Sequence, residues 1–158
     1  MSQDYVIDTN LLVYASNPEA VLNSKMPREA FEVAFTWLDH FQSGSGCVIL
    51  DTSDVIVKEY RRALSEQDFG HLVLIELMTH QRVKYEVIDM DNDGFAMLPA
   101  GLENVRDRDD RKFVAVAIEN TPSIIAHGCD TDWYDCETDL QRFNILLEHV
   151  LDKWCRPI

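Results

Sequence analysis

The sequence lacks the usual signatures of a zinc site. Its four cysteines form no Cys-x-x-Cys pair, and its five histidines form no His-x-x-x-His pair. Coordination of zinc by thiolate and imidazole is therefore not expected. We expect free thiols and a reduced, cytoplasmic setting.

Long apolar runs and linkers are also missing. No stretch approaches the roughly 20 apolar residues that a membrane-spanning helix needs, and the first residues do not resemble a signal peptide. The sequence shows no repeat, no low-complexity tract and no segment rich in proline and glycine. We predict one domain over residues 1–158, with no membrane partner.

Basic residues are scarce, with 14 Lys and Arg against 28 Asp and Glu and a formal net charge of −14 at pH 7. An acidic chain of this kind repels nucleic acid at long range, which favours a small-molecule enzyme or an interaction protein. Half of the basic residues nevertheless lie beside candidate site acids: Lys58, Arg61, Arg62, Arg106, Arg108, Arg111 and Lys112. They could hold phosphates locally; ion pairing within helices, as for Glu59 with Arg62, is the alternative.

Short apolar runs alternate with segments of helical periodicity. The predicted strands are Tyr5–Ile7, Cys47–Leu50, Val83–Ile88, Ser123–Ala126 and Ile145–Val150, the last preferred over a helix. The predicted helices cover about 11–14, 27–42, 55–64, 69–80 and 110–118. This alternation indicates an α/β fold with a mostly parallel sheet. In such sheets, function gathers beyond the carboxyl ends of the strands.

Acidic residues follow two of these strands. Asp8 comes directly after Tyr5–Ile7, and Asp130 and Asp132 follow Ser123–Ala126. Asp8 could instead cap the helix that follows it. The Asp130-Thr131-Asp132 segment could be an ordinary turn.

Two further acids lie on the apolar faces of predicted helices. Glu59 stands three residues after Ile56 and four before Ala63, so it shares their face. Asp110 precedes Phe113 and the rest of an apolar stripe, although it could also be a cap. A carboxylate on an apolar face is costly unless a cation or hydrogen-bond donors meet it.

Together these acids predict a cation site. Converging carboxylates repel one another, and a divalent cation relieves that repulsion. A site made only of oxygen ligands suits Mg²⁺ or Mn²⁺. The predicted catalytic and metal-binding residues are Asp8, Glu59, Asp110, Asp130 and Asp132.

Four segments resemble the motifs of PIN-domain nucleases, in the family's order. Residues 6–14, with Asp8-Thr9-Asn10, resemble the opening strand and turn, and residues 56–60 are similar to the second motif, a helical Glu followed by an aromatic residue. Residues 110–117 resemble the third motif, an acid leading an Ala-rich helix. Residues 130–133 resemble the fourth, Asp-x-Asp after a strand. Here His127-Gly128-Cys129 precedes Asp130 and Trp133 takes the usual Leu position, which leaves open whether Asp130 or Asp132 touches the metal.

The resemblance implies a three-layer α/β/α sandwich and a Mg²⁺- or Mn²⁺-dependent ribonuclease that hydrolyses RNA phosphodiester bonds. Many relatives are toxins of toxin–antitoxin pairs, others mature or degrade RNA, and relatives often dimerise. An antitoxin or other protein partner and a homodimer are therefore expectations.

Supporting roles fall on residues beside the acids. Thr9 and Asn10 are expected to fix the Asp8 carboxylate by hydrogen bonds. Contacts to substrate phosphate are expected from Lys58, Arg62, Arg111 and Lys112.

Two rival interpretations remain. A degenerate PIN fold acting as an interaction module fits the altered fourth motif and the acidic surface. A phosphatase of the haloacid-dehalogenase type would use Asp8 as nucleophile and needs an acid two residues later, where this chain has Asn10.

Overall fold

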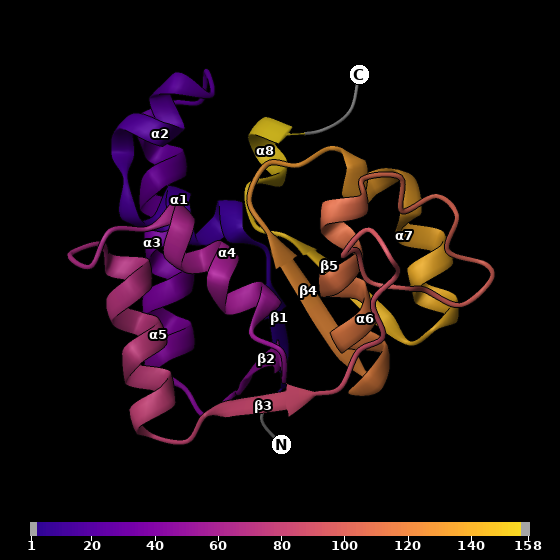
Figure 1. The fold of residues 1–158 in the computed structure, drawn as a ribbon. Helices are drawn as coiled ribbons and strands as arrows, with labels where there is room; N and C mark the ends of the chain where they lie inside the picture. The colour runs from indigo at the N-terminus through magenta and orange to yellow at the C-terminus, as the bar shows by residue number, and fades with distance from the viewer. Residues whose placement is uncertain (1–2, 156–158) are drawn as a thin grey trace.

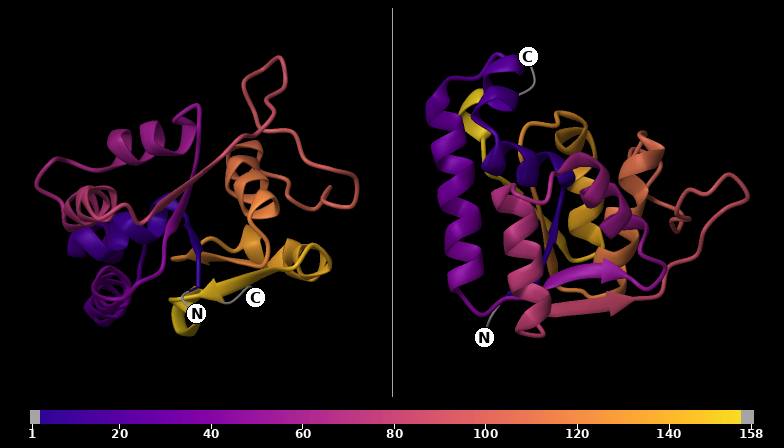
Figure 2. Two further views of the ribbon diagram at one scale, coloured as in Figure 1. Left: turned by 90° about the horizontal axis from the view of Figure 1, so that it is seen from below. Right: turned by 60° about the vertical axis from the view of Figure 1, so that its left-hand side comes forward.

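The computed structural model describes residues 3–155, which form a parallel β-sheet covered by helices on both faces (Figure 1). The five strands run in the order β3-β2-β1-β4-β5, and every neighbouring pair is parallel. Helices α1, α3 and α5 cover one face, and α6 and α7 cover the other (Figure 2). The predicted three-layer α/β/α sandwich is confirmed.

The elements alternate along the chain as the apolar pattern predicts. The strands are β1 (Tyr5–Ile7), β2 (Val48–Asp51), β3 (Val83–Glu86), β4 (Ser123–His127) and β5 (Ile145–His149). The helices are α1 (Thr9–Ser16), α2 (Pro18–Asn23), α3 (Arg28–Ser43), α4 (Val55–Ala63), α5 (Phe69–Thr79), the 3₁₀ helix η1 (Arg108–Asp110), α6 (Arg111–Glu119), α7 (Asp132–Arg142) and α8 (Asp152–Cys155).

The strand order places the first strand of the chain at the centre of the sheet. The chain adds β2 and β3 on one side of β1 and then crosses to add β4 and β5 on the other. The register pairs Ile7 with Ala126, and the Asp8 amide donates to the Ala126 carbonyl at 2.9 Å. The direction of strand addition therefore reverses between β1 and β4, and open α/β sheets bind ligands at such a crevice.

The apolar stripes explain why the helices pack where they do. Helix α3 buries Ala30, Ala34, Leu38 and Phe41, spaced three or four residues apart along one face. The preferred strand at the C-terminal end is confirmed as β5, whereas β3 stops at Glu86, short of the predicted Ile88. Helix α7 was not predicted, although Trp133, Cys136 and Leu140 form its buried stripe.

The expectation of free thiols is wrong for two of the cysteines. Cys129 and Cys155 form a disulfide with their Cα atoms 5.2 Å apart, while Cys47 and Cys136 are free. No local pattern indicates this pair, because the two cysteines stand 26 residues apart and meet only after β5 returns beside β4. The argument from free thiols to a reducing compartment therefore applies only to Cys47 and Cys136.

No helix within residues 3–155 combines the length and the apolar character that crossing a bilayer requires.

Candidate metal centre

Three aspartates converge at the carboxyl edge of the sheet. One carboxylate oxygen from each of Asp8, Asp110 and Asp130 lies within 4.8 Å of the others. They line a cavity of about 600 Å³ that also includes Glu59, Thr9 and Asn10. Four of the five predicted ligands thus share one cavity, although they come from the end of β1, from α4, from η1 and from the loop after β4.

Asp8 is buried against the sheet, and this burial makes ionisation of its carboxyl group unfavourable. It is 6% exposed, and desolvation raises the pKa of its carboxyl to about 7. The Trp133 indole N–H, 2.8 Å from Asp8 Oδ2, opposes this rise, whereas the charges of Asp130 and Glu59 add to it. Asp8 occupies the N-cap position of α1, but its side chain makes no capping hydrogen bond. Its carboxylate therefore does not serve as a helix cap, and the N–H groups of Trp133 and Asn10 do not offset the effect of burial on its pKa.

Ionisation is also unfavourable for the carboxyl groups of Asp110 and Asp130. Burial raises the pKa of Asp110 to about 8, with further increases from the charges of Asp8 and Asp130. Burial also raises the pKa of Asp130. Three neighbouring acids that resist ionisation together are what a divalent cation would stabilise, since its charge favours their ionised forms. The donor set is all oxygen and fits Mg²⁺ or Mn²⁺.

Glu59 reaches the cavity but already has partners. The Thr9 hydroxyl donates to Glu59 Oε2, and the Lys112 ammonium lies 2.8 Å from Glu59 Oε1. The predicted alternative of an ion pair with Arg62 is replaced by this pair with Lys112. Glu59 is thus anchored at the rim of the cavity, where it can bind a cation through water.

Asp132 lies apart from the main cluster. It is exposed and groups with Asp107 and Asp110, not with Asp8 and Asp130. Its backbone N–H donates to Asp130 Oδ1 at 3.0 Å, so Asp130 also closes the turn that leads into α7. Of the two acids in the fourth motif, Asp130 is the one placed to contact a cation beside Asp8.

The expected side-chain bonds from Thr9 and Asn10 to Asp8 are not found. Thr9 instead donates to Glu59, and Asn10 Oδ1 accepts the Gly128 N–H at 3.0 Å. Both residues follow Asp8 on α1, but the helical turn directs their side chains to α4 and to the loop after β4. Their side chains thus connect the walls of the cavity, and only the backbone N–H of Asn10 acts on the Asp8 carboxylate.

Trp133 and Gly128 are supporting residues that the sequence did not single out for this purpose. Trp133 is 1% exposed and is the indole donor to Asp8. A Cβ on Gly128 would lie 2.6 Å from a ring carbon of Tyr14, so only glycine lets this loop approach α1 so closely. The Trp in place of the usual Leu was the available signal, because a buried indole needs an acceptor.

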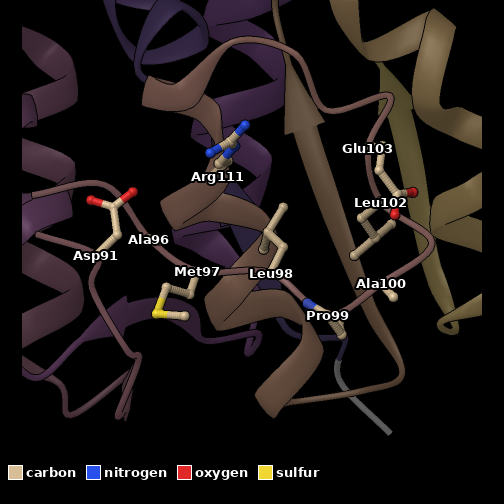
Figure 3. Close-up of a pocket in the computed structure, with 9 residues that line it drawn as sticks. All are labelled: Asp91, Ala96, Met97, Leu98, Pro99, Ala100, Leu102, Glu103 and Arg111. Atoms are coloured by element: carbon tan, nitrogen blue, oxygen red, sulfur yellow. The ribbon is translucent and has the colours of Figure 1, made fainter. Parts of the chain in front are cut away.

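The four basic residues predicted to contact phosphate lie in different parts of the structure. Lys112 is buried and, with Arg62, lines a smaller cavity beside Glu59. Arg111 faces another cavity, of about 330 Å³, whose wall also carries Asp91 and Glu103 (Figure 3). Lys58 is exposed on α4. Of the four residues predicted to contact phosphate, Arg62 and Lys112 are therefore the two that lie beside the acids.

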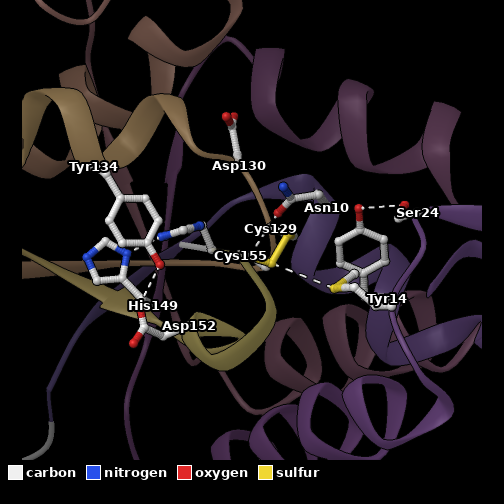
Figure 4. The surroundings of a disulfide bond; sticks show 12 residues. Asn10, Tyr14, Ser24, Cys129, Asp130, Tyr134, His149, Asp152 and Cys155 are labelled. Atoms are coloured by element: carbon white, nitrogen blue, oxygen red, sulfur yellow. Dashed lines mark hydrogen bonds between the residues drawn. A yellow bond between two sulfur atoms is a disulfide. The ribbon is translucent and has the colours of Figure 1, made fainter. Parts of the chain in front are cut away.

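The loop that carries Asp130 is fastened covalently. Cys129, the residue before Asp130, is bonded to Cys155 in α8, with Asn10 and Tyr14 beside the bond (Figure 4). Asp130 extends away from the two sulfur atoms in this view. The disulfide thus ties the C-terminal helix to one wall of the candidate metal centre.

The sequence matches no protein-family model, and neither the curated proteins nor the solved structures contain a match.

Proposed function

We propose that this protein is a Mg²⁺- or Mn²⁺-dependent ribonuclease of the PIN type. The observation that carries the proposal is the convergence of Asp8, Asp110 and Asp130 at the crevice between β1 and β4, with the pKa of each carboxyl raised. The four sequence motifs occur in the order found in PIN-domain nucleases, and this order favours a nuclease over other metal enzymes.

Each residue has a role that follows from its surroundings. Asp8, Asp110 and Asp130 would hold the cation directly, and Glu59 would bind it through water from the rim. A bound divalent cation supplies charge neutralisation for the scissile phosphate and a nucleophilic water near neutral pH. Trp133 holds the Asp8 carboxylate in one orientation through its indole N–H. Asp132, at the exposed edge, is left to orient water or substrate.

The first test is a calorimetric titration with Mn²⁺ of the wild type, Asp110→Asn and Asp135→Asn. Asp135 is an exposed acid on α7 outside both acid groups, so its variant makes the same change of charge away from the cluster. We expect saturable binding in the wild type and Asp135→Asn, and binding weakened by more than about tenfold in Asp110→Asn. A Mn²⁺-dependent cleavage assay on single-stranded RNA follows. Equal binding by all three folded proteins would refute the metal centre.

An interaction module with a degenerate site is the second candidate, and the Glu59–Lys112 pair favours it. Lys112 neutralises Glu59 at 2.8 Å, which leaves one acid fewer to bind a cation. Folded wild-type protein that binds no Mn²⁺ but forms a stable complex with a partner would support this candidate. The phosphatase alternative has less support, because Asn10, where it needs an acid, is bonded to Gly128.

The biological setting is part of the proposal. The proposal of a cytoplasmic location rests on the two free thiols, Cys47 and Cys136, whereas an antitoxin-like partner and a homodimer are implied by the resemblance to PIN-domain nucleases.

A further inference from the structure

A second, smaller cavity lies beside the acids, under the segment that joins β3 to η1. In this segment Met90 and Ala96 form an isolated antiparallel bridge, and Asp91 Oδ1 accepts the N–H groups of Asp93 and Phe95. The resulting tight turn encloses, with α4 and α6, a cavity of about 140 Å³. This space is enough for several waters or one phosphate group.

The cavity is basic, unlike the rest of the chain. Arg62, Arg108 and Lys112 are among its ten lining residues, although the whole sequence has only 14 Lys and Arg in 158 residues. Its acids are Glu59, which is paired with Lys112, and Asp109. The cations thus outnumber the acids in this cavity, which makes it suitable for an anion.

The two arginines differ in how they are held. The Arg108 guanidinium lies 5.5 Å from the centroid of the Phe95 ring and 3.8 Å from the exposed Asp93 carboxylate, so it is already oriented. Arg62 is exposed and has no ion pair, hydrogen bond or ring contact with any residue in 3–155. Its guanidinium fork is therefore free to bind phosphate oxygens in a bidentate manner.

Glu59 connects this cavity to the metal centre. It lines both cavities, and Val55, Glu59 and Arg62 follow one another on α4 at steps of four and three residues. Arg61, only two residues beyond Glu59, points about 200° round the helix from it. A strand of nucleic acid at the metal centre would thus pass over Glu59 toward Arg62.

We propose that the cavity beside Glu59 binds a phosphate group of the RNA strand, next to the phosphate that is cleaved. This inference rests on the proposed ribonuclease function. Arg62 is the main donor, Arg108 is a second donor held by Phe95, and Lys112 neutralises Glu59 so that it does not repel the phosphate. The site provides local attraction for RNA on a protein whose net charge opposes binding.

Binding of a short fluorescent single-stranded RNA, measured by anisotropy in EDTA at low salt, tests the proposal without cleavage. We compare the wild type with Arg62→Gln, Arg108→Gln and the matched control Arg61→Gln, which removes the same charge from the side of α4 that faces away from Glu59. Arg62→Gln is expected to weaken binding about tenfold and to flatten the salt dependence by roughly one phosphate contact. Arg61→Gln is expected to change affinity less than about twofold. Equal losses in Arg62→Gln and Arg61→Gln would overturn the proposal.

Inorganic phosphate distinguishes the group that is recognised. Competition of phosphate with RNA in the wild type, weakened in Arg62→Gln but not in Arg61→Gln, would show that phosphate oxygens occupy the cavity. Competition unaffected by Arg62→Gln would place the phosphate elsewhere and refute the assignment.

A parallel cleavage assay with Mn²⁺ separates this inference from the ribonuclease proposal. Cleavage whose KM is the same in Arg62→Gln and Arg61→Gln would keep the ribonuclease and remove the phosphate site. Arg62-dependent RNA binding in a protein that never cleaves would keep the phosphate site and remove the ribonuclease.

Discussion

Asp8 and Asp51 stand at the ends of neighbouring strands, yet the protein treats them differently. Both are buried, at 6% and 0% exposed, and both precede a helix. Asp51 accepts the N–H groups of Val55 and Ile56, each at 2.9 Å, so its carboxylate caps α4. Asp8 makes no cap, and burial raises its pKa to about 7.

The difference indicates which of the two strand ends could hold a cation. A buried carboxylate is stable when backbone N–H groups meet it, and such an acid has a structural role. At Asp8 the Trp133 and Asn10 N–H groups do not offset burial and the neighbouring acids, and on the proposed function a cation supplies the remaining stabilisation. Both aspartates follow strands, so position alone does not distinguish them. Their hydrogen-bond partners and charged neighbours distinguish the structural carboxylate of Asp51 from the candidate ligand Asp8.

The largest contrast is expected in cation binding by Asp8→Asn and Asp51→Asn. Asp8→Asn removes a proposed direct ligand, so Mn²⁺ affinity is expected to fall more than about 100-fold. Asp51→Asn leaves the cluster in place and is expected to bind within a few-fold of the wild type. Calorimetry on both variants, with circular dichroism to check folding, measures this. A folded Asp51→Asn protein that loses Mn²⁺ as completely as Asp8→Asn would break the comparison.

The free energy of unfolding is expected to rank the two variants the other way, with the larger loss in Asp51→Asn. Asp51→Asn weakens two charge-assisted bonds to the start of α4 and is expected to cost about 2 kcal/mol of unfolding free energy. Asp8→Asn removes a carboxylate that resists ionisation, so at pH 8 in EDTA it is expected to stabilise the protein. Urea denaturation of the two variants beside the wild type gives both values. Destabilisation of both by the same amount would mean that Asp8, too, is a structural cap.

The pH dependence of the unfolding free energy is expected to differ between the Asp8 and Asp51 variants as well. The pKa values of Asp8 and Asp110 are raised from 3.8 to about 7 and about 8, so the folded state binds protons more tightly than the unfolded chain. Their contribution to stability is full below about pH 4 and is lost as the pH rises toward 8. In EDTA we expect Asp8→Asn and Asp110→Asn each to flatten this decline. Asp51→Asn should keep it, and saturating Mn²⁺ should oppose it in the wild type.

The smallest effect is expected from Trp133→Phe, which removes the indole donor to Asp8. Mn²⁺ affinity is expected to fall about tenfold, because a residue that orients a ligand is lost. Trp37→Phe is the control, since Trp37 makes a similar 2.8 Å bond to Glu148 outside the acid cluster. A tenfold loss in both variants would show that the effect is one of general packing.

Much of the fold could be predicted because periodicity reports burial directly. The buried runs at Val48–Leu50 and Ile125–Ala126 and the stripe of α3 required only local pattern. Helix α7 was missed because Asp132, Asp135 and Asp139 make its sequence look like a polar loop. Its stripe of Trp133, Cys136 and Leu140 has helical spacing, but the burial of Trp133 beside Asp8 comes from tertiary packing.

The site was predictable as a set of acids but not as a geometry. Asp8, Glu59, Asp110 and Asp130 do meet in one cavity. The pairing of Glu59 with Lys112 joins residues 53 positions apart, and the Cys129–Cys155 bond depends on the return of the chain through β5. Contacts of that kind are set by tertiary packing, and sequence spacing does not report them.

The four acids of the cavity are far apart in the sequence, so they can come together only late in the synthesis of the chain. Asp8 is made early, but its position beside Asp130 depends on β4, which pairs with β1 only after the intervening residues 8–122 have been made. A growing chain that ends before β4 would carry three of the acids without the crevice that gathers them. Cation binding would then accompany completion of the sheet and add its own free energy to the finished fold. On the proposed function, a ribosome making this protein would not be exposed to an active nuclease before the chain had been made as far as Asp130.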